Sequence, residues 1–369
     1  MNVLIFIHSS YTRFHTVINN YFFEKSMYAV VRVFLFMLSP EKAHVVSLKL
    51  LRILMSIFFI RWFVRRFTRA KKHSVFCFGL EFEHPVGLAA GFDKNADYID
   101  LIEDLSFAFI EVGSVTNRPS LGNAKPRLFR LQSDEGIINR MGLNNEGSNR
   151  VAKKLSKRKI TVPLFINVAK TPDKSMTEAE IIDDYCQSIQ KLKSYADVMV
   201  LNISCPNADG GRTFEDPELL TALLTKVREV LSTDECPLLI KVSPDLSTTQ
   251  LENTVRVCET FEIDGYTATN TTVRRDGLIA SDERLNQIGN GGLSGKPLHE
   301  RAVEVVRHLR GLTDKPIVGV GGVFDAQSAQ DFLDAGASLV QLYSGFVYGG
   351  PSVVRRITRG IIPNPALAE

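Results

Sequence analysis

The sequence predicts an α/β fold, a (β/α)8 TIM barrel with a small N-terminal helical segment, and three observations carry this prediction. From about residue 76 onward, a short apolar strand, a turn with Gly or Asn and an amphipathic stretch recur eight times. The 369 residues, 44% of them hydrophobic, suffice to bury one large domain and a smaller appendage. No GxGxxG follows the first strand, which disfavours the alternative fold, a doubly wound open sheet.

The chain is predicted to have three parts. Residues 1–26 form a poorly specified extension, residues 27–72 an amphipathic helical segment, and residues 73–369 the barrel. The extension lacks a convincing cleavage site, so a targeting peptide is the lesser alternative. Residues 1–72 hold twelve Lys/Arg and two acids, a net charge of +10, which leaves −7 on the rest to give the total of +3. The positive charge is therefore concentrated at the N-terminus.

Residues 27–67 are predicted to form two short helices rather than a membrane span. Ser39 supplies a capping hydroxyl, and Pro40 presets the backbone of the first turn. Lys49 and Arg52 interrupt the apolar run that follows. No stretch reaches about 18 uninterrupted apolar residues, the length that a spanning helix needs.

The second of these helices has the composition of a membrane-surface helix. Its aromatic and cationic residues alternate: Phe58, Phe59, Trp62, Phe63 and Phe67 with Arg61, Arg65, Arg66 and Arg69. We expect it to lie in the headgroup layer of a lipid bilayer, with the arginines at the phosphates. The alternative is a helical cap packed on the barrel with a solvated basic face.

The eight predicted strands are short apolar runs bounded by turn residues. They are residues 86–90, 108–112, 164–168, 198–201, 238–242, 265–268, 316–320 and 339–342. Helix starts fall between them. Thr177 with Glu180 is a capping box, and Asp216-Pro217 opens another amphipathic stretch.

Because the carboxyl ends of barrel strands meet at one mouth, polar residues that follow the strands are expected to converge there. Cys205 lies between two carboxamides, Asn202 and Asn207, in a turn stiffened by Pro206. We interpret Cys205 as a catalytic base. The alternative is a small buried residue, which is common for cysteine.

The last two strand ends predict a phosphate cradle. Gly321-Gly322 lets backbone amides approach a ligand, and Ser344-Gly345 adds donors at a short helix start. Lys241, at the end of an apolar strand, would be costly unless it faced an anion, such as the negative charge that develops on a flavin. Its alternative role is pairing with Asp245.

Carboxamides and a lysine form the predicted substrate site. They are Asn139, Asn202, Asn207 and Asn270, with Thr271, and Lys94 provides the cation. This set suits a planar ligand with ring amides and a carboxylate.

Cysteine usage points to a reducing compartment. Cys77, Cys186, Cys205, Cys236 and Cys258 are odd in number and show no CxxC or Cys/His spacing. We therefore expect neither a disulfide framework nor a metal site.

Several motifs resemble those of dihydroorotate dehydrogenase over about residues 27–360. They are GLAAGFDK at 87–94, GSVTNRP at 113–119, KPRLFRL at 125–131, NRMG at 139–142, ATNTT at 268–272, GGLSG at 291–295 and QLYSGF at 341–346. LSPEKAH at 38–44 resembles the membrane-docking helical pair of the quinone-dependent, class 2 branch.

The resemblance implies oxidation of (S)-dihydroorotate to orotate in pyrimidine (UMP) biosynthesis. Cys205 would take the C5 proton while hydride passes from C6 to flavin N5. The resemblance implies FMN contacts at Ala90, Gly91, Lys94, Ser114, Asn167, Asn202, Lys241, Thr269, Gly295, Gly322, Tyr343 and Ser344. It implies dihydroorotate contacts at Lys94, Asn139, Arg140, Met141, Gly142, Leu143, Asn202, Asn207, Asn270 and Thr271.

The implied partners are a membrane quinone, entering between the two N-terminal helices, and the lipid bilayer surface, with no nucleic acid. The implied location is the cytoplasmic face of the cell membrane, or the mitochondrial inner membrane in a eukaryote. Cys205 departs from the branch, which typically has Ser there, and with the following DGGRTF it looks more like the soluble branch. Leu143 replaces a usual aromatic residue.

Three other functions remain as alternatives. One is a soluble dihydroorotate dehydrogenase that uses fumarate or NAD. Another is a catalytically silent barrel held at the membrane, which the presence of Lys94, Cys205 and Lys241 disfavours. The third is a flavin-free barrel acting on sugar phosphates, which would leave Lys241 and the Asn-rich turns without a role.

Overall fold

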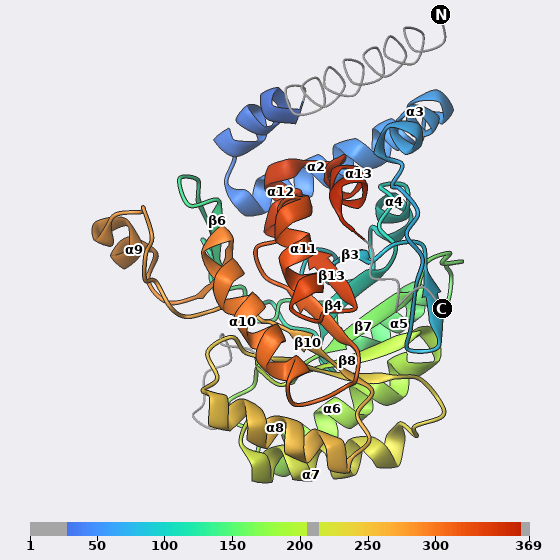
Figure 1. Ribbon diagram of the computed structural model, residues 1–369, viewed down its shortest axis with the longest axis vertical. Coiled ribbons are helices and arrows are strands. Elements are labelled where there is room, and N and C mark those ends of the chain that lie inside the picture. Colours follow the sequence, from blue (N-terminus) through green and yellow to red (C-terminus); the bar gives the residue numbers. More distant parts are fainter. Residues whose placement is uncertain (1–27, 205–213, 363–369) are drawn as a thin grey trace, which may run out of the picture.

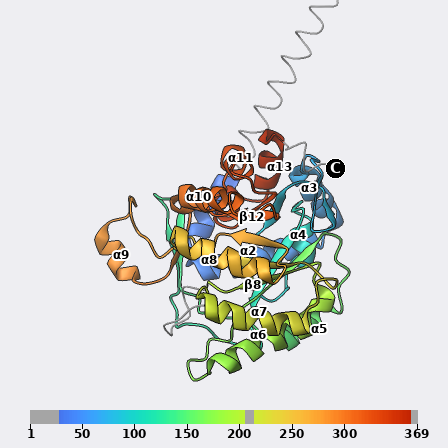
Figure 2. The same ribbon diagram turned by 60° about the horizontal axis from the view of Figure 1, so that its bottom comes forward.

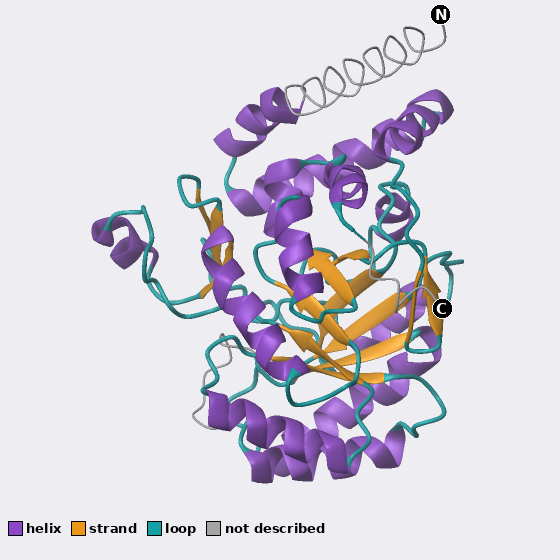
Figure 3. Cartoon of the chain, in the orientation of Figure 1, coloured by secondary structure: helices purple, strands orange, loops and turns teal. Residues whose placement is uncertain are grey.

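The computed structural model describes residues 28–204 and 214–362 (Figure 1). The predicted extension 1–26, Cys205 and Asn207 lie outside the described residues. As predicted, eight parallel strands close into a barrel, and helices surround it (Figure 3). The strands are β3 (Val86–Leu88), β4 (Ile110–Val115), β7 (Leu164–Val168), β8 (Val198–Asn202), β9 (Leu238–Val242), β10 (Gly265–Ala268), β12 (Ile317–Val320) and β13 (Leu339–Leu342).

Each barrel strand pairs with the strands that precede and follow it in the predicted series, and β13 closes the barrel against β3. Every residue of β7, β8 and β9 is buried. Strands of a parallel sheet covered by helices are buried on both faces, which explains why they read as continuous apolar runs.

Two helices start where the capping residues predicted from the sequence lie. Thr177 and Glu180 complete the capping box, and Asp216 accepts hydrogen bonds from two first-turn amides. The helices around the barrel are α4 (Ile99–Glu103), α5 (Ser148–Leu155), α6 (Glu178–Leu192), α7 (Pro217–Val230), α8 (Thr248–Thr260), α10 (His299–Arg310), α11 (Ala326–Asp334), α12 (Ser344–Gly349) and α13 (Val353–Gly360).

The barrel interior is divided into an apolar and a polar layer. The apolar cluster at the amino end includes Phe109, Phe165, Val200, Leu239, Val318 and Leu339. Because side chains two positions apart on a strand share a face, the next inward residues form the layer above it. Five buried residues of that layer, which we call the polar layer, are Glu111, Asn167, Lys241, Thr267 and Gln341. A barrel interior this polar indicates that it supports a site.

Two smaller sheets, not predicted from the sequence, flank the barrel. The hairpin β1 (Val75–Cys77) and β2 (Leu80–Phe82) packs on the apolar cluster and so closes that end. The antiparallel sheet β5 (Leu128–Leu131), β6 (Gly136–Asn139) and β11 (Gly292–Gly295) stands beside the mouth. The arm that carries α9 (Asp282–Ile288) projects beyond it in both views (Figures 1 and 2).

The N-terminal segment has three helices where the sequence predicted two: the helix Tyr28–Met37, α2 (Pro40–Met55) and α3 (Phe58–Thr68). Ser39 precedes α2 as predicted, but its hydroxyl makes no capping hydrogen bond. They lie along the barrel near α12 and α13 (Figure 1). Among the described residues, no single helix is long and apolar enough to cross a membrane. α2 and α3 would pass that test only as a pair, and they are bent by 113° relative to each other.

Candidate active site

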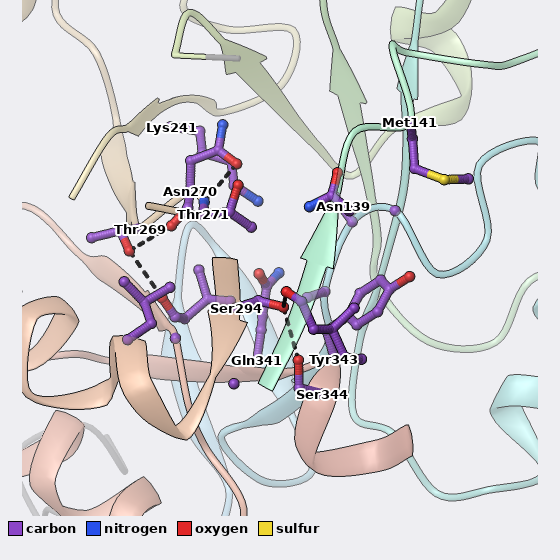
Figure 4. A pocket seen from close by; sticks show the side chains of 18 of the residues that line it. Asn139, Met141, Lys241, Thr269, Asn270, Thr271, Ser294, Gln341, Tyr343 and Ser344 are labelled. Carbon is purple, nitrogen blue, oxygen red and sulfur yellow. Dashed lines mark hydrogen bonds between the residues drawn. The ribbon is translucent and has the colours of Figure 1, made fainter. Parts of the chain in front are cut away.

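A cavity of about 160 Å³ lies at the carboxyl ends of the barrel strands (Figure 4). Seventeen of the predicted site residues line it: Ala90, Gly91, Lys94, Ser114, Asn139, Met141, Gly142, Leu143, Asn202, Lys241, Thr269, Asn270, Thr271, Gly295, Gly322, Tyr343 and Ser344. The structure thus brings together residues that are up to 254 positions apart, as the predicted convergence of strand ends requires.

Two described residues of the predicted site do not line this cavity. Asn167 lies in the polar layer. Arg140 donates hydrogen bonds to the carbonyls of Ile288 and Pro126, and its guanidinium lies over the ring of Phe129, 4.9 Å from the centroid. Arg140 therefore braces the base of the α9 arm.

A chain of amides runs across one wall of the cavity. Asn202 Nδ2 donates to Ser114 Oγ at 3.0 Å, and Asn270 Nδ2 donates to Asn202 Oδ1 at 3.3 Å and to the Ser204 carbonyl at 2.9 Å. These bonds fix which end of each carboxamide is donor and which is acceptor. The wall is therefore prepared for a ligand with both donors and acceptors on one edge.

Lys94 provides a cation in the lining of the cavity. Its Nζ donates to the Gly91 carbonyl at 3.1 Å. Burial, followed by the positive charge of Arg127, lowers the pKa of Lys94 to about 8. Lys94 is thus protonated at neutral pH and suited to an anionic ligand group.

Lys241 belongs to a buried network that the sequence did not reveal. Its Nζ lies 3.9 Å from the carboxylate of Glu111, a fully buried residue of β4. The carboxylate proposed from the sequence, Asp245, instead accepts hydrogen bonds from Thr272 Oγ1 and the Val273 amide. The interpretation that Lys241 pairs with Asp245 is therefore wrong, because a carboxylate from the opposite side of the barrel is its neighbour.

Glu111 also accepts hydrogen bonds from two side-chain amides of the polar layer. Asn167 Nδ2 donates at 2.7 Å and Gln341 Nε2 at 2.6 Å. The carbonyl oxygens of the same two amides, Asn167 Oδ1 and Gln341 Oε1, are buried and have no hydrogen-bond partner among the described residues. Buried acceptors of this kind are costly unless something donates to them, which fits a ligand with N–H groups.

Glycines line the cavity at the ends of β11 and β12. Gly295 and Gly322 have positive φ values of 99° and 71°, which favour glycine. A Cβ on Gly322 would lie 2.7 Å from the Cβ of His299, so close packing against α10 also requires glycine there. Beside them the hydroxyls of Ser294 and Ser344 are 3.0 Å apart (Figure 4). Exposed backbone amides and two hydroxyls suit a phosphate group.

A second cavity, of about 130 Å³, opens between α2, the helix Tyr28–Met37 and α12. Most of its lining is apolar or aromatic: Tyr28, Leu35, Phe36, Pro40, Ala43, His44, Ser47, Leu48, Leu51, Phe92, Leu128, Arg130, Ile137, Tyr343, Phe346, Val347, Gly350 and Pro351. Leu128, Ile137 and Tyr343 line both cavities and so form the wall between them.

The polar side chains in the second cavity are either neutral at physiological pH or occupied in hydrogen bonds to the backbone. Burial and the nearby positive charge of Lys94 lower the pKa of His44 to about 4, and burial raises the pKa of Tyr343 to about 12. The guanidinium of Arg130 caps the helix Tyr28–Met37 by donating to the carbonyls of Leu35, Phe36 and Leu38. The second cavity therefore suits an uncharged, apolar molecule.

The comparisons with known proteins agree with this geometry. The family model described as dihydroorotate dehydrogenase matches residues 73–364. The chain is 40% identical over 335 residues to the dihydroorotate dehydrogenase (quinone) of Haloarcula marismortui, which covers 90% of this chain and 93% of the relative. It is 40% identical over 339 residues to the protein of the same name from Rhodococcus erythropolis, with 91% and 94% covered.

Two solved structures from Eimeria tenella are similar to the chain. The crystal structure of DHODH in complex with ferulenol gives a TM-score of 0.76 at 29% identity and covers 88% of this chain and 90% of its own. The ligand-free type gives 0.71 at 30% identity, with 82% and 92% covered.

Proposed function

Because this chain belongs to the dihydroorotate dehydrogenase family, we propose that it oxidises dihydroorotate to orotate with a quinone as the electron acceptor, a step of pyrimidine biosynthesis. The observation that carries the proposal is the pair of cavities that share one wall. One is polar, with amides and a lysine, and the other is apolar and opens between N-terminal helices. The polar cavity suits a polar ring substrate, and the apolar cavity suits an apolar electron acceptor.

The family uses a flavin, and we propose FMN for this chain. The unpartnered carbonyl oxygens of Asn167 and Gln341, the cation of Lys241 and the glycine-lined phosphate cradle support it. The residues proposed to hold FMN are Ala90, Gly91, Lys94, Ser114, Asn167, Asn202, Lys241, Thr269, Gly295, Gly322, Tyr343 and Ser344. We add Gln341 and Ser294 to this proposal because they line the same cavity. When bound, FMN supplies the acceptor for the hydride from C6 of dihydroorotate.

The proposed substrate residues recognise a carboxylate and ring amides. Lys94 pairs with the carboxylate, and Asn139, Asn202 and Asn270 with the ring groups. Met141, Gly142, Leu143 and Thr271 complete the lining, and Arg140 holds the neighbouring backbone. Asn207 belongs to this proposal from its sequence position alone.

We propose Cys205 as the base that takes the C5 proton. The support comes from the sequence, which places this thiol between Asn202 and Asn207 directly after the described end of β8. A thiol has an unperturbed pKa of about 8.5, far lower than a serine hydroxyl, so it ionises with less help from neighbours.

The proposed quinone site is the second cavity, entered between α2 and the helix Tyr28–Met37. The wall of Leu128, Ile137 and Tyr343 separates the acceptor from the dihydroorotate site while keeping both close. An apolar access route suits a quinone that is dissolved in lipid.

We also propose that the protein is a peripheral membrane protein that docks on the bilayer through α3. Phe58, Phe59, Trp62 and Phe63 are 56–78% exposed on this helix. Arg61 and Arg65 instead turn to the barrel, where both bind the buried carboxylate of Asp104 at 2.7 and 2.5 Å. α3 is thereby fixed to the body with its aromatic side outward, as docking on the cytoplasmic face of a membrane requires.

An acceptor screen with the purified protein tests the function. We expect yellow protein whose flavin absorbance bleaches anaerobically with dihydroorotate and recovers when a quinone analogue is added. Recovery with fumarate or NAD, and none with quinones, would replace the acceptor assignment. Colourless protein without flavin would contradict the function as a whole.

A further inference from the structure

Glu111 is the one fully buried carboxylate among the described residues of the polar layer. Its side chain extends from β4 into the barrel. There it approaches Asn167 of β7, Lys241 of β9 and Gln341 of β13. No other described acidic residue approaches Lys241 within ion-pair distance. The cost of burying a carboxylate here implies that it has a function in the site.

The carboxylate determines how two neighbouring amides are oriented. An ionised carboxylate only accepts hydrogen bonds, so Asn167 and Gln341 must turn their NH2 groups toward Glu111. Their carbonyl oxygens then remain unpaired. A neutral amide at position 111 would donate as well as accept, and one of the two neighbours could then reverse.

Glu111 also interacts electrostatically with Lys241 without forming a short hydrogen bond to it. The two short hydrogen bonds of the carboxylate, 2.7 and 2.6 Å, go to the amides, whereas the lysine Nζ is 3.9 Å away. Lys241 therefore still lines the cavity, and the carboxylate of Glu111 partly balances its charge. Two unit charges at this separation interact appreciably even when partly screened.

We propose that Glu111 is a positioning residue of the cofactor site, which orients the amides of Asn167 and Gln341 and sets the potential of the bound flavin by balancing the charge of Lys241. The inference rests on the proposed flavin function. Negative charge develops on a flavin when it is reduced, and a nearby carboxylate opposes that charge. Glu111 therefore keeps the flavin potential lower than Lys241 alone would set it, which favours passage of electrons onward.

The test is the midpoint potential of the flavin bound to the full-length protein, measured by spectroelectrochemistry. Glu111→Gln should raise it by at least about 30 mV, the two-electron equivalent of a tenfold change in the relative affinity for reduced and oxidised flavin. Glu111→Asp keeps the charge and should recover most of the shift. Thr267→Val is the matched control, because Thr267 is in the same layer, pairs with Lys241 in register and should leave the potential unchanged.

If Glu111→Gln loses its flavin, the effect of Glu111→Gln on the midpoint potential is measured in the Lys241→Gln variant instead. Lys241→Gln should lower the potential, and the double variant should lie above that single variant. A potential for Glu111→Gln equal to that of Thr267→Val, or a double variant equal to Lys241→Gln, would overturn the proposal. Wild-type protein without any flavin spectrum would instead contradict the proposed function, so the two failures are distinguishable.

Discussion

At the scale of single residues, we predict that Lys94 makes substrate binding dependent on pH. Burial lowers the pKa of Lys94 to about 8, so the side chain loses its charge as the pH rises through 8. Dihydroorotate and orotate carry a carboxylate, which is proposed to pair with the protonated form. We expect the Kd for orotate, measured by perturbation of the flavin spectrum, to be level from pH 6 to 7.5 and to rise toward tenfold per pH unit above pH 8.

Lys94→Arg is the control for this pH dependence. An arginine keeps its charge throughout the range, so the profile of the variant should be flat up to pH 10, although its different geometry weakens binding. A rise above pH 8 that persists in Lys94→Arg would assign the dependence to another group.

Cys205 gives a second prediction at this scale. Cys205→Ala should keep its flavin, while the anaerobic reduction of that flavin by dihydroorotate slows by about 10²–10⁴-fold, the usual contribution of a positioned base. Cys205→Ser should keep part of the rate because a hydroxyl can still accept the proton. Flavin reduction at near the wild-type rate in the alanine variant would remove Cys205 from the mechanism.

Site residues that directly follow a strand could be predicted from the sequence, because the carboxyl ends of all the barrel strands meet at one mouth. Glu111 and Gln341 were not recognised as site residues. Glu111 lies inside an apolar run, and its partners Asn167 and Gln341 are 56 and 230 residues away in the sequence. The alternation of buried residues along a strand was the available signal, but it has meaning only once the inner face is known.

At the scale of elements, α3 carries the predicted attachment to the membrane. Phe59→Asp with Trp62→Asp removes two of its most exposed aromatic side chains and adds charge that the headgroup phosphates repel. Each buried aromatic contributes about 1.5–3 kcal/mol to partitioning. We expect binding to anionic phospholipid vesicles, measured by cosedimentation, to fall at least tenfold.

Phe76→Asp is the matched control for α3. Phe76 is 51% exposed on β1, in the hairpin that closes the opposite end of the barrel. This variant should bind vesicles like the wild type, and neither variant should change the thermal midpoint much, since exposed substitutions are usually worth less than about 0.5 kcal/mol. Equal losses in both variants would argue against docking through α3.

The elements of the barrel could be predicted because each strand is a short apolar run between turn residues, and some helices, such as α6 and α7, begin with a capping signal. The sheet of β5, β6 and β11 could not. β11 pairs with β6 in antiparallel register from Gly292 opposite Asn139, so the two strands are far apart in the sequence. Strands of four residues give too little periodicity to be recognised without their partners.

At the scale of the whole molecule, the proposed reaction is divided between two cavities, one in the barrel and one beside the N-terminal helices. The barrel supplies the polar cavity, and α2 supplies one side of the apolar cavity. Leu128 and Ile137, which form part of the shared wall, come from the sheet that the sequence did not reveal. The added sheet thus brings the helical segment and the barrel into one functional unit.

This division predicts that the two half-reactions can be disabled separately. Ala43 is buried on α2 and lines the second cavity, so Ala43→Phe fills space where the quinone is proposed to bind. We expect quinone reduction to fall at least tenfold in steady-state assays, while anaerobic flavin reduction by dihydroorotate keeps its wild-type rate. Overpacking costs about 1–3 kcal/mol, so the thermal midpoint is measured in parallel.

Val46→Phe places the same ring on an exposed part of α2, because Val46 is 46% exposed and does not line the second cavity. It should leave both half-reactions unchanged, because the added ring lies outside the cavity. If Ala43→Phe slowed dihydroorotate oxidation as much as quinone reduction, the two cavities would not act as separate sites. Among the described residues, the wall between the two cavities is formed by Leu128, Ile137 and Tyr343 alone. If Ala43→Phe slows quinone reduction but not flavin reduction, this thin wall keeps the two ligands apart while electrons still pass between them.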